Sequence, residues 1–318
     1  MTRLVTGATG FIGSRVLRAG DRRLVRSSLN DKHVFIGDLL DVESLNKACE
    51  GVDSVFHCAG FAHAFVASDP LIHWRVNFEG TRNLVDAAGR AGVKTFVFLS
   101  SVKAMADPIT RCVDEDWPGE PNTPYGKAKR AAEESVLQAG VKFGMHVVNL
   151  RLSMVYGKGG RGNLERMLRA VQRGWFPPIP ETGNRRSIVH VDDVVAAMEL
   201  VSTHERANGR TYILSDPQSY SGREIYDAIR YALLQRRTPC RRPVPFDIPA
   251  NAFRVAGLVG DLVGFVRGSP FAFNSEVVNR LLNSAWYSPA RIENELGWRA
   301  KISLGDGLLE LLNNETRI

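Results

Sequence analysis

Tyr125 and Lys129 lie four residues apart, directly after Pro124, and Ser100 and Ser101 precede them along the chain. Pro124 suits the first turn of a helix, where its missing N–H is no loss. Four residues advance a helix by roughly 400°, so the tyrosine and the lysine project from nearly one face. A cation beside a phenol lowers the pKa of the phenol, which makes it a usable acid or base near neutral pH. An ordinary surface helix could carry the same pair, so the rest of the chain must decide.

The elements that would position this pair alternate along the first half of the chain. Short apolar runs predict strands, and amphipathic patterns between them predict helices. Such alternation is typical of parallel strands joined by crossover helices, so the expected fold class is α/β with a Rossmann-type doubly wound parallel sheet. The expected strands are residues 4–6, 24–26, 34–36, 54–58, 95–100 and 146–151, and the expected helices are residues 11–19, 42–49, 74–91 and 124–142.

The second half of the chain is less regular. We interpret it as a smaller mixed α/β lobe at the carboxyl ends of the strands, where ligands of such sheets bind. The sheet domain is expected to comprise residues 1–155 plus about 186–210, and the lobe residues 156–185 and 211–318. The expected elements are a helix at 164–173, a proline-rich turn at 177–180, a strand–helix unit at 188–201, and helices at 221–234, 250–266, 275–283 and 289–296.

Composition and charge bound the function. The chain has 318 residues, 44% of them hydrophobic, which suits one large core with a smaller lobe. Its 41 basic and 34 acidic residues leave a net charge of +7. The basic residues are dispersed and accompany no nucleic-acid-binding motif, so no nucleic-acid partner is expected. A mild positive field that attracts phosphorylated small molecules explains the charge equally well.

The cysteines and the apolar segments indicate a cytoplasmic protein. Cys49, Cys58, Cys112 and Cys240 share no metal-ligand spacing, so we expect reduced thiols and no metal site. The chain enters a predicted strand at once, and no apolar run approaches the ~20 residues that span a bilayer. The segment 250–273 is the most apolar long stretch, and it is either a membrane-contacting helix or a core or lid helix.

A glycine-rich loop follows the first predicted strand. Gly7, Gly10 and Gly13 are three residues apart, between a strand and a helix. Glycines there allow a tight turn and a close approach to a pyrophosphate, which the helix N-terminus attracts. The loop therefore predicts a dinucleotide cofactor.

The second predicted strand bears on the choice between NAD and NADP. Where NAD enzymes usually carry an acidic residue, this chain has Arg26 and Ser27, which favour the 2′-phosphate of NADP. NAD stays open, because the short first helix makes the alignment unsure. Asp38 either accepts a hydrogen bond from the adenine amino group or caps the following helix, and Asp41 is better placed to cap it.

These features occur in one order with further motifs. They are Gly7-x-x-Gly10-x-x-Gly13, Cys58-Ala59-Gly60, Asn77-x-x-Gly80-Thr81, Ser101, Tyr125-x-x-x-Lys129 and residues 151–157, 186–193 and 295–298. With them the chain resembles the extended short-chain dehydrogenase/reductases, and within these the NAD-dependent nucleotide-sugar epimerase/dehydratase family. The similarity runs nearly end to end, and it implies an NAD(P)-binding sheet domain with a nucleotide-sugar-binding lobe.

The resemblance implies a role for each matched residue. Tyr125 would be the general acid/base, Lys129 would lower its pKa and hold the nicotinamide ribose, and Ser101 would hydrogen-bond the reacting oxygen. Asn77 resembles the structural and active-site asparagine of the family. The implied cofactor contacts are Gly7, Thr9, Gly10, Phe11, Ile12, Gly13, Arg26, Asp38, Leu39, Ala59, Gly60, Asn77, Ser100, Tyr125, Lys129 and Leu152.

The resemblance also implies a diphosphate site for the substrate. Asn163 and Leu164 match the position where related enzymes contact the nucleotide diphosphate. Arg186 matches their diphosphate-binding arginine, and Arg280 is the expected second one. Arginine forks suit phosphate oxygens. His190 is expected to pack or hydrogen-bond locally.

Two departures from the family refine the expected reaction. The dehydratases carry an Asp-Glu pair directly after the catalytic hydroxyl residue, whereas Ser101 is followed by Val102. The carboxylates at 114–116 come too late to replace that pair, so dehydration is not expected. Leu152 replaces the usual proline after Arg151. This conservative change slightly weakens the match to the family on the cofactor side of the site.

Three segments, 100–103, 163–175 and 184–187, resemble bacterial UDP-sugar 4-epimerases and 4-keto-reductases of surface-polysaccharide synthesis. We expect an NAD(P)-dependent 4-epimerase that acts through a 4-keto intermediate, with a UDP-4-keto-sugar reductase as the alternative. Arg186 and Asn163 count against a reductase of a non-nucleotide carbonyl, and the Tyr125/Lys129 pair counts against a cofactor-sensing regulator. Relatives often dimerise through the helix that bears Tyr125, so a homodimer is expected.

Overall fold

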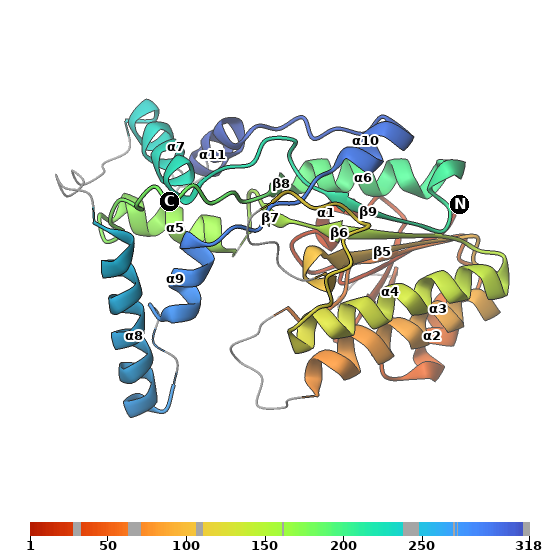
Figure 1. Cartoon of the computed structure of the whole chain (residues 1–318). Coiled ribbons are helices and arrows are strands. Elements are labelled where there is room, and N and C mark those ends of the chain that lie inside the picture. The colour runs from red at the N-terminus through yellow and green to blue at the C-terminus, as the bar shows by residue number, and fades with distance from the viewer. Residues whose placement is uncertain are drawn as a thin grey trace.

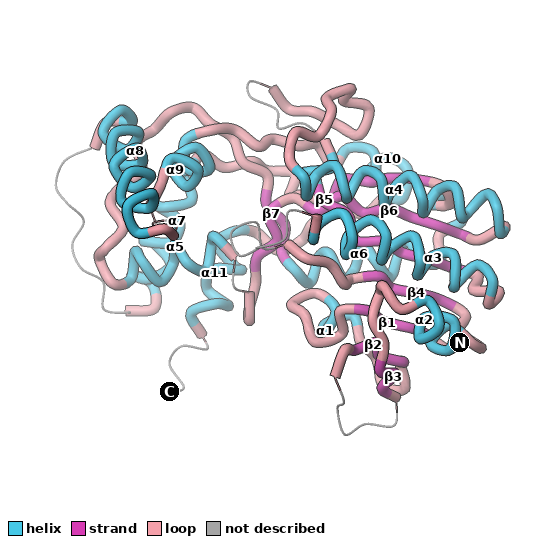
Figure 2. Tube along the Cα trace, turned by 90° about the horizontal axis from the view of Figure 1, so that it is seen from below, coloured by secondary structure: helices cyan, strands magenta, loops and turns pink. Residues whose placement is uncertain are grey.

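A parallel sheet lies at the centre of the protein (Figure 1, Figure 2). The computed structural model describes residues 1–27, 33–62, 71–105, 111–160, 162–237, 248–269, 271 and 273–313. Within these residues the sheet has seven strands in the order β3-β2-β1-β4-β5-β6-β9, and every pairing is parallel. The predicted doubly wound sheet is therefore confirmed. The strands are β1 Arg3–Thr6, β2 Arg22–Val25, β3 Val34–Ile36, β4 Ser54–His57, β5 Thr95–Ser101, β6 His146–Leu152 and β9 Arg210–Leu214.

Helices cover both faces of the sheet, as buried parallel strands require (Figure 1). On one face Leu84 and Val136 pack against Phe96 of β5 in one buried cluster. On the other face Val194 and Ile292 belong to a second cluster. The first face carries α2 Val42–Cys49, α3 Gly80–Arg90 and α4 Pro124–Phe143, and the second carries α1 Gly13–Val16, α6 Val191–Thr203 and α10 Ala290–Leu296.

Five elements differ from the sequence-based predictions, and two of them, β7 Met154–Tyr156 and α11 Leu304–Leu312, were not predicted at all. Helix α1 ends at Val16, because Leu17 is extended and the chain turns directly into β2. The helix predicted over 74–91 begins as a π-helix, η1 Trp74–Glu79, before α3. Strand β9 was also not predicted, and its first residue, Arg210, is exposed. Two short 3-10 turns also occur, η2 Val102–Ala104 and η3 Glu205–Ala207.

A group of helices forms a lobe beside the carboxyl ends of the strands (Figure 1). A parallel pair, β7 Met154–Tyr156 and β8 Ile188–His190, leads into it from β6. Strand β9 and the buried Trp298 belong to the sheet and its core, although both fall in the range predicted for the lobe. The domain boundaries otherwise stay a prediction. The lobe helices are α5 Asn163–Gln172, α7 Gly222–Gln235, α8 Ala250–Arg267, α9 Ser275–Leu282 and α11 Leu304–Leu312.

Two chain-wide expectations concern membranes and cysteines. None of the described helices is both long enough and apolar enough to cross a membrane. Cys49, Cys58 and Cys112 are free thiols, in agreement with the expectation, and Cys240 lies outside the described residues.

The core between α3 and the sheet gives a direct test of the fold. Leu84 is fully buried there, so Leu84→Ala should lower the free energy of unfolding by about 2–5 kcal/mol. Val141 on α4 is 90% exposed, and Val141→Ala should change the same quantity by less than about 0.5 kcal/mol. Urea unfolding of both variants measures the difference, and equal losses would contradict this packing.

Candidate active site

The N-terminus of α4 rests on the segment that follows β5. Thr123 caps the helix, since its hydroxyl accepts a hydrogen bond from the N–H of Gly126 at 3.1 Å. Gly126 lies directly on the carbonyl oxygen of Lys103, where a Cβ would collide. This close approach holds Tyr125 at the end of β5, close enough for the side chain of Ser101 to lower the pKa of its phenol. The structure therefore brings together the two residues that the sequence predicts to act on the reacting oxygen.

In this structure Lys129 is not among the groups that shift the pKa of Tyr125, and its predicted effect on the tyrosine stays a prediction. Burial raises the pKa of Tyr125, and only the hydrogen bond with Ser101 opposes that shift. The Nζ of Lys129 instead donates to the carbonyl oxygen of Leu99 at 2.9 Å and lies 4.6 Å from the ring centroid of Phe98. Burial also lowers the pKa of Lys129 to about 8. The Lys129 ammonium is thus buried and directed at a carbonyl, while burial is the main cause of the shift in the pKa of the Tyr125 phenol.

A buried ion pair lies one helical turn beyond Lys129. The guanidinium of Arg151 donates to both carboxylate oxygens of Glu133, at 2.9 and 2.7 Å. The hydroxyl of Ser100 donates to the same carboxylate at 2.5 Å. Glu133 raises the pKa of Lys129 and so opposes the effect of burial. The sequence analysis missed Glu133, although its spacing of four residues from Lys129 on one helix was a usable signal.

The loop after β1 has the tight geometry that a phosphate-binding turn needs. Gly7 has a φ of +66°, and a Cβ there would lie 2.7 Å from the backbone nitrogen of Ala59. A Cβ at Gly13 would collide with the carbonyl of Gly7, which also accepts the N–H of Gly10 at 2.8 Å. Only glycine fits these positions. The other predicted loop residues, Thr9, Phe11 and Ile12, are exposed or partly exposed.

A buried chain of hydrogen bonds connects β1 to Asn77. The hydroxyl of Thr6 lies 2.7 Å from Nδ1 of His57, and Nε2 of His57 lies 2.9 Å from the hydroxyl of Thr81. Thr81 in turn donates to the carbonyl of Asn77 at 2.7 Å. Burial lowers the pKa of His57 to about 3, so its ring is neutral. The side chain of Asn77 binds both the N–H and the carbonyl of Phe61, which fixes the segment after β4.

The predicted cofactor residues of β4, η1 and α4 converge at Gly60. A Cβ at Gly60 would lie 3.0 Å from Oδ1 of Asn77 and 3.5 Å from Nζ of Lys129. The N–H of Ala59 donates to Thr6 at 3.2 Å. Leu152, the last residue of β6, is buried beside Ser101 in the sheet register.

The residues predicted at the adenosine end lie after β2 and β3. Arg26 is exposed directly after β2. Asp41, not Asp38, caps α2, and its carboxylate accepts two backbone N–H groups at 3.1 and 3.3 Å. Asp38 accepts the N–H of Leu40 at 2.9 Å, within the turn that also holds the partly buried Leu39. The role of Asp38 toward adenine stays a prediction.

The two residues predicted at the start of α5 differ in exposure. Asn163 is exposed at the first position of the helix. The side chain of Leu164 is only 2% exposed and packs in the core of the lobe. A substrate contact from Leu164 would therefore have to come from its backbone.

The structure brings the two predicted diphosphate arginines together. The guanidinium of Arg186 donates to the backbone carbonyls of Arg280 and, at 3.1 Å, of Asn283. The side chain of Arg280 pairs with Glu276 one turn earlier on α9. Both arginines are partly exposed. They lie at the end of α9 and the start of β8, and therefore border the lobe.

His190 has the local role that the sequence predicts. Its Nδ1 accepts the N–H of Asp192 at 3.3 Å, which caps α6, and its ring lies edge-on to Tyr156. Nε2 lies 3.4 Å from the carboxylate of Glu310. Among the described residues, His190 and the carboxylates of Asp192 and Glu310 offer ligand atoms that lie within 4.8 Å of one another, which makes them a candidate metal-ligand set. Nδ1 of His190 already accepts the hydrogen bond that caps α6. The expectation that the protein has no metal site therefore stays a prediction.

Comparisons with known proteins identify the family. The sequence profile described as the NAD dependent epimerase/dehydratase family matches residues 3–215. The protein therefore belongs to this family, as its motifs predicted. The UDP-glucose 4-epimerase of Vibrio cholerae is 28% identical over 96% of this chain and 92% of its own. The N-acetyl-alpha-D-glucosaminyl-diphospho-ditrans,octacis-undecaprenol 4-epimerase of Escherichia coli O157:H7 is 25% identical over 98% of this chain and 94% of its own.

A solved structure supports the same fold. The UDP-glucose 4-epimerase of Thermus thermophilus, in complex with NAD, has a TM-score of 0.74 to this protein. It covers 100% of this chain and 99% of its own, at 23% sequence identity. At that identity the similarity shows the fold alone.

Lys129 should give the site a pH limit. Its folded-state pKa of about 8 lies below the ordinary 10.5, so the ammonium is charged below pH 8 and neutral above it. A dinucleotide is anionic, and a charged hydrogen bond is worth about 1.5–3 kcal/mol. The affinity for NAD should therefore fall about tenfold or more as the pH rises through 8. The folded state itself should gain stability between pH 8 and 10.5, because the buried charge is lost there first.

Fluorescence titrations with NAD on both sides of pH 8 measure this effect. The Lys129→Met variant is the control, since it should bind NAD weakly at every pH. A wild-type affinity that does not change across this range would contradict the assignment, as would the same step in the variant.

Proposed function

We propose that this protein is an NAD(P)-dependent enzyme that acts at C4 of a UDP-sugar, as a 4-epimerase with a 4-keto intermediate. The observation that carries the proposal is the proximity of Tyr125 to Ser101, whose side chain lowers the pKa of the phenol, with Lys129 one turn away on the same helix. A carbonyl–hydroxyl exchange needs a proton donor and acceptor at the sugar oxygen, and this pair supplies both. The similarity to UDP-glucose 4-epimerases over nearly the whole chain supports the same reaction.

The residues at the strand ends fit a dinucleotide. The glycines at 7, 10 and 13 leave no side chain in the turn after β1, and Gly60 leaves space between Asn77 and Lys129. In the proposal the loop holds the pyrophosphate and Lys129 holds the nicotinamide ribose. NAD or NADP, when bound, supplies hydride transfer at the sugar carbon. Arg26, exposed after β2, is the residue that would favour NADP.

Proton transfer falls to Tyr125 and Ser101. In oxidation of the sugar, Tyr125 Oη takes the proton of the C4 hydroxyl, and in reduction it returns a proton to the C4 oxygen. Ser101 hydrogen-bonds the same oxygen and keeps it near the phenol. Glu133 acts through Lys129: its carboxylate raises the pKa of the ammonium and is itself held in place by its ion pair with Arg151. Glu133 is therefore a positioning residue and not a catalytic one.

One observation favours a UDP-4-keto-sugar reductase as the second candidate. Burial raises the pKa of Tyr125, so in this structure the phenol is held protonated. A protonated phenol is ready to donate to a keto oxygen, whereas an epimerase must first use it as a base. For epimerisation a cation must therefore come closer to the phenol than Lys129 does here.

A polyprenyl-diphosphate sugar is a further candidate substrate. A relative that acts on an undecaprenol-linked sugar aligns with 98% of this chain. The two arginines at the end of α9 would bind either diphosphate. Incubation with UDP-N-acetylglucosamine and with its polyprenyl-diphosphate counterpart, each followed by analysis of the released sugar, separates the two. The homodimer and the cytoplasmic location stay predictions.

Loss of the phenol should stop the reaction. Tyr125→Phe should lower kcat about 10²–10⁴-fold, because general acid–base catalysis contributes that much, while NAD affinity stays unchanged. Tyr231→Phe is the matched control, since Tyr231 is an exposed tyrosine on α7. Coupled assays of UDP-glucose and UDP-galactose interconversion measure both variants. Unimpaired turnover in Tyr125→Phe would exclude the proposed mechanism.

The same assay separates epimerase from reductase. An epimerase interconverts the two sugars without net consumption of cofactor. A reductase consumes one NADH or NADPH for each 4-keto-sugar that it reduces, and it does not interconvert the two sugars.

Arg186 should contribute to UDP binding. Arg186→Ala should weaken UDP binding about tenfold or more, because it removes charged hydrogen bonds to the diphosphate. Saturating UDP should raise the thermal midpoint of the wild type, and less so that of the variant. Arg185→Ala is the control, since Arg185 pairs with Glu224 on the surface. No stabilisation of the wild type by UDP would favour a reductase of a non-nucleotide carbonyl.

A further inference from the structure

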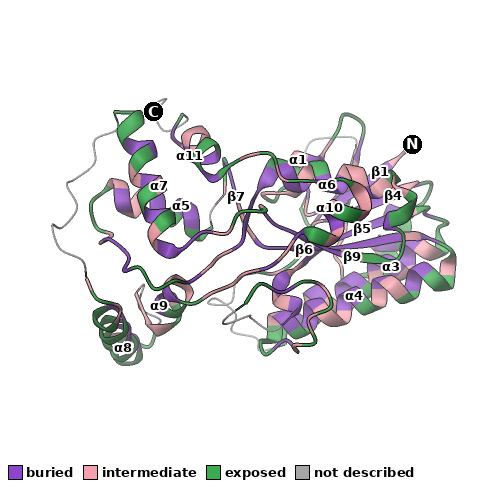
Figure 3. Cartoon of the chain, turned by 45° about the horizontal axis from the view of Figure 1, so that its top comes forward, coloured by how far each residue is buried: buried purple, intermediate pink, exposed green. Residues whose placement is uncertain are grey.

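Helix α8 turns a wide apolar face to solvent. Its buried residues recur every three or four positions and so line one side of the helix. The opposite side is apolar and 55% to 86% exposed, and most of α8 has the colour of exposed residues in Figure 3. The buried residues are Phe253, Gly257, Gly260 and Gly264, and the exposed ones are Val255, Leu258, Val259, Leu262, Phe265 and Val266.

The protein holds α8 mainly through glycines. A Cβ at Gly257 would lie 2.9 Å from Val278 of α9, and one at Gly260 would collide with the carbonyl of Phe273. Phe253 is the one large side chain on this side of α8, and its ring lies 6.1 Å from that of Phe273. The large apolar side chains of α8 therefore point away from the described part of the chain. The sequence left open whether this segment is a core helix, and the exposure of its apolar side chains excludes that interpretation.

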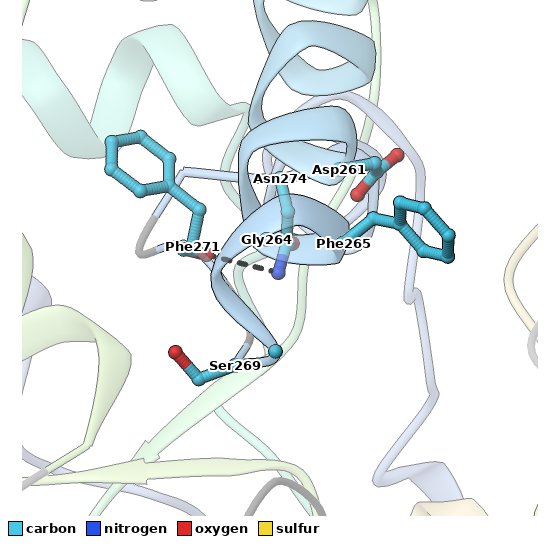
Figure 4. A pocket seen from close by; sticks show the side chains of 7 residues that line it. Asp261, Gly264, Phe265, Ser269, Phe271 and Asn274 are labelled. Carbon is cyan, nitrogen blue, oxygen red and sulfur yellow. Dashed lines mark hydrogen bonds between the residues drawn. The ribbon is translucent and has the colours of Figure 1, made fainter.

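The C-terminal end of α8 continues this apolar character. A hollow of about 390 Å³ lies there, between the helix and the start of α9. Figure 4 shows Phe265 pointing outward from the last turns of α8 and Phe271 on the other side of the hollow. Neither Tyr125 nor Arg186 is among its lining residues, so the hollow is separate from the proposed active site.

The charged residues of α8 lie outside its exposed apolar stripe, with Arg254 at one edge and Arg267 at the C-terminal end of the helix. The carboxylate of Asp261 accepts the N–H of Ser275 at 3.2 Å and so faces α9. Arg254 bonds to Asn251 of its own helix, and Arg267 is exposed at the last position. Within the described residues neither arginine pairs with a carboxylate. The whole chain also carries a net charge of +7.

We propose that α8 lies on an anionic phospholipid surface, with its apolar face at the boundary of headgroups and acyl chains. An apolar face flanked by unpaired basic residues is the pattern of helices that bind in the plane of such a surface. A large exposed apolar patch on an otherwise charged protein marks an interaction site. The uncompensated arginines complement lipid phosphates.

A second copy of the protein fits α8 less well. The exposed stripe covers positions 255, 258, 259, 262, 265 and 266, which is wider than the seam of a two-stranded coiled coil. An antiparallel pair of α8 helices would also bring Arg254 of one copy near Arg267 of the other, and like charges repel. Lipid phosphates would neutralise the same two residues.

Co-sedimentation with vesicles tests the proposal. The full chain should bind vesicles of equal parts phosphatidylglycerol and phosphatidylcholine, and bind phosphatidylcholine alone more weakly. Leu262→Ser should lower the partition coefficient about tenfold, because one leucine leaves the interface. Leu234→Ser is the matched control on α7, since both leucine side chains are 63% exposed. The control should bind as the wild type does.

The arginines are tested separately. The double variant Arg254→Gln/Arg267→Gln should lose about tenfold or more of its binding to the anionic vesicles and none on phosphatidylcholine alone. All variants should unfold at the wild-type temperature, since the changed side chains are exposed. Absence of vesicle binding by the wild type would overturn the proposal, as would equal losses in Leu262→Ser and Leu234→Ser. A dimer that Leu262→Ser converts to monomers would show that a second copy covers the face. None of these readouts depends on the proposed reaction.

Discussion

The close contact between Gly126 and the carbonyl of Lys103 is the constraint on which the proposed active site depends. Any side chain at this position would push the start of α4 away from the end of β5. With glycine there, Tyr125 comes close to Ser101, although the two lie 24 positions apart in the chain. The parallel sheet fixes one end of this contact and the Thr123 cap fixes the other. The position of Tyr125 beside Ser101 thus follows from backbone packing.

Burial sets the protonation of the site. The same desolvation raises the pKa of Tyr125 and lowers that of Lys129, so both groups are driven toward their neutral forms. Glu133 opposes this effect at Lys129, and Arg151 and Ser100 both bind its carboxylate. A buried pair of this kind is costly to desolvate, and its retention here is explained by its effect on the lysine. Small changes of charge near the site should therefore shift the protonation of Tyr125 and Lys129.

Local patterns allowed most of the sheet and the catalytic candidates to be predicted from the sequence. Strands such as β5 are apolar runs, and Tyr125 and Lys129 show their shared face by spacing alone. What the sequence could not reveal depends on tertiary contacts. The Lys129 ammonium is directed at the Leu99 carbonyl, and Asn77 of the π-helix binds the Phe61 backbone. The exposure of α8 likewise depends on which side its glycines pack.

The central claim is that Tyr125 is the proton-transfer residue of a site that becomes complete when the cofactor binds. Ultraviolet difference titration of wild type against Tyr125→Phe, with and without oxidised NAD, isolates this one phenol. In the free protein its pKa should lie above the usual 10.0. With NAD it should fall below that value, because the nicotinamide ring adds a cation to the site. A pKa that is the same with and without NAD would contradict the account.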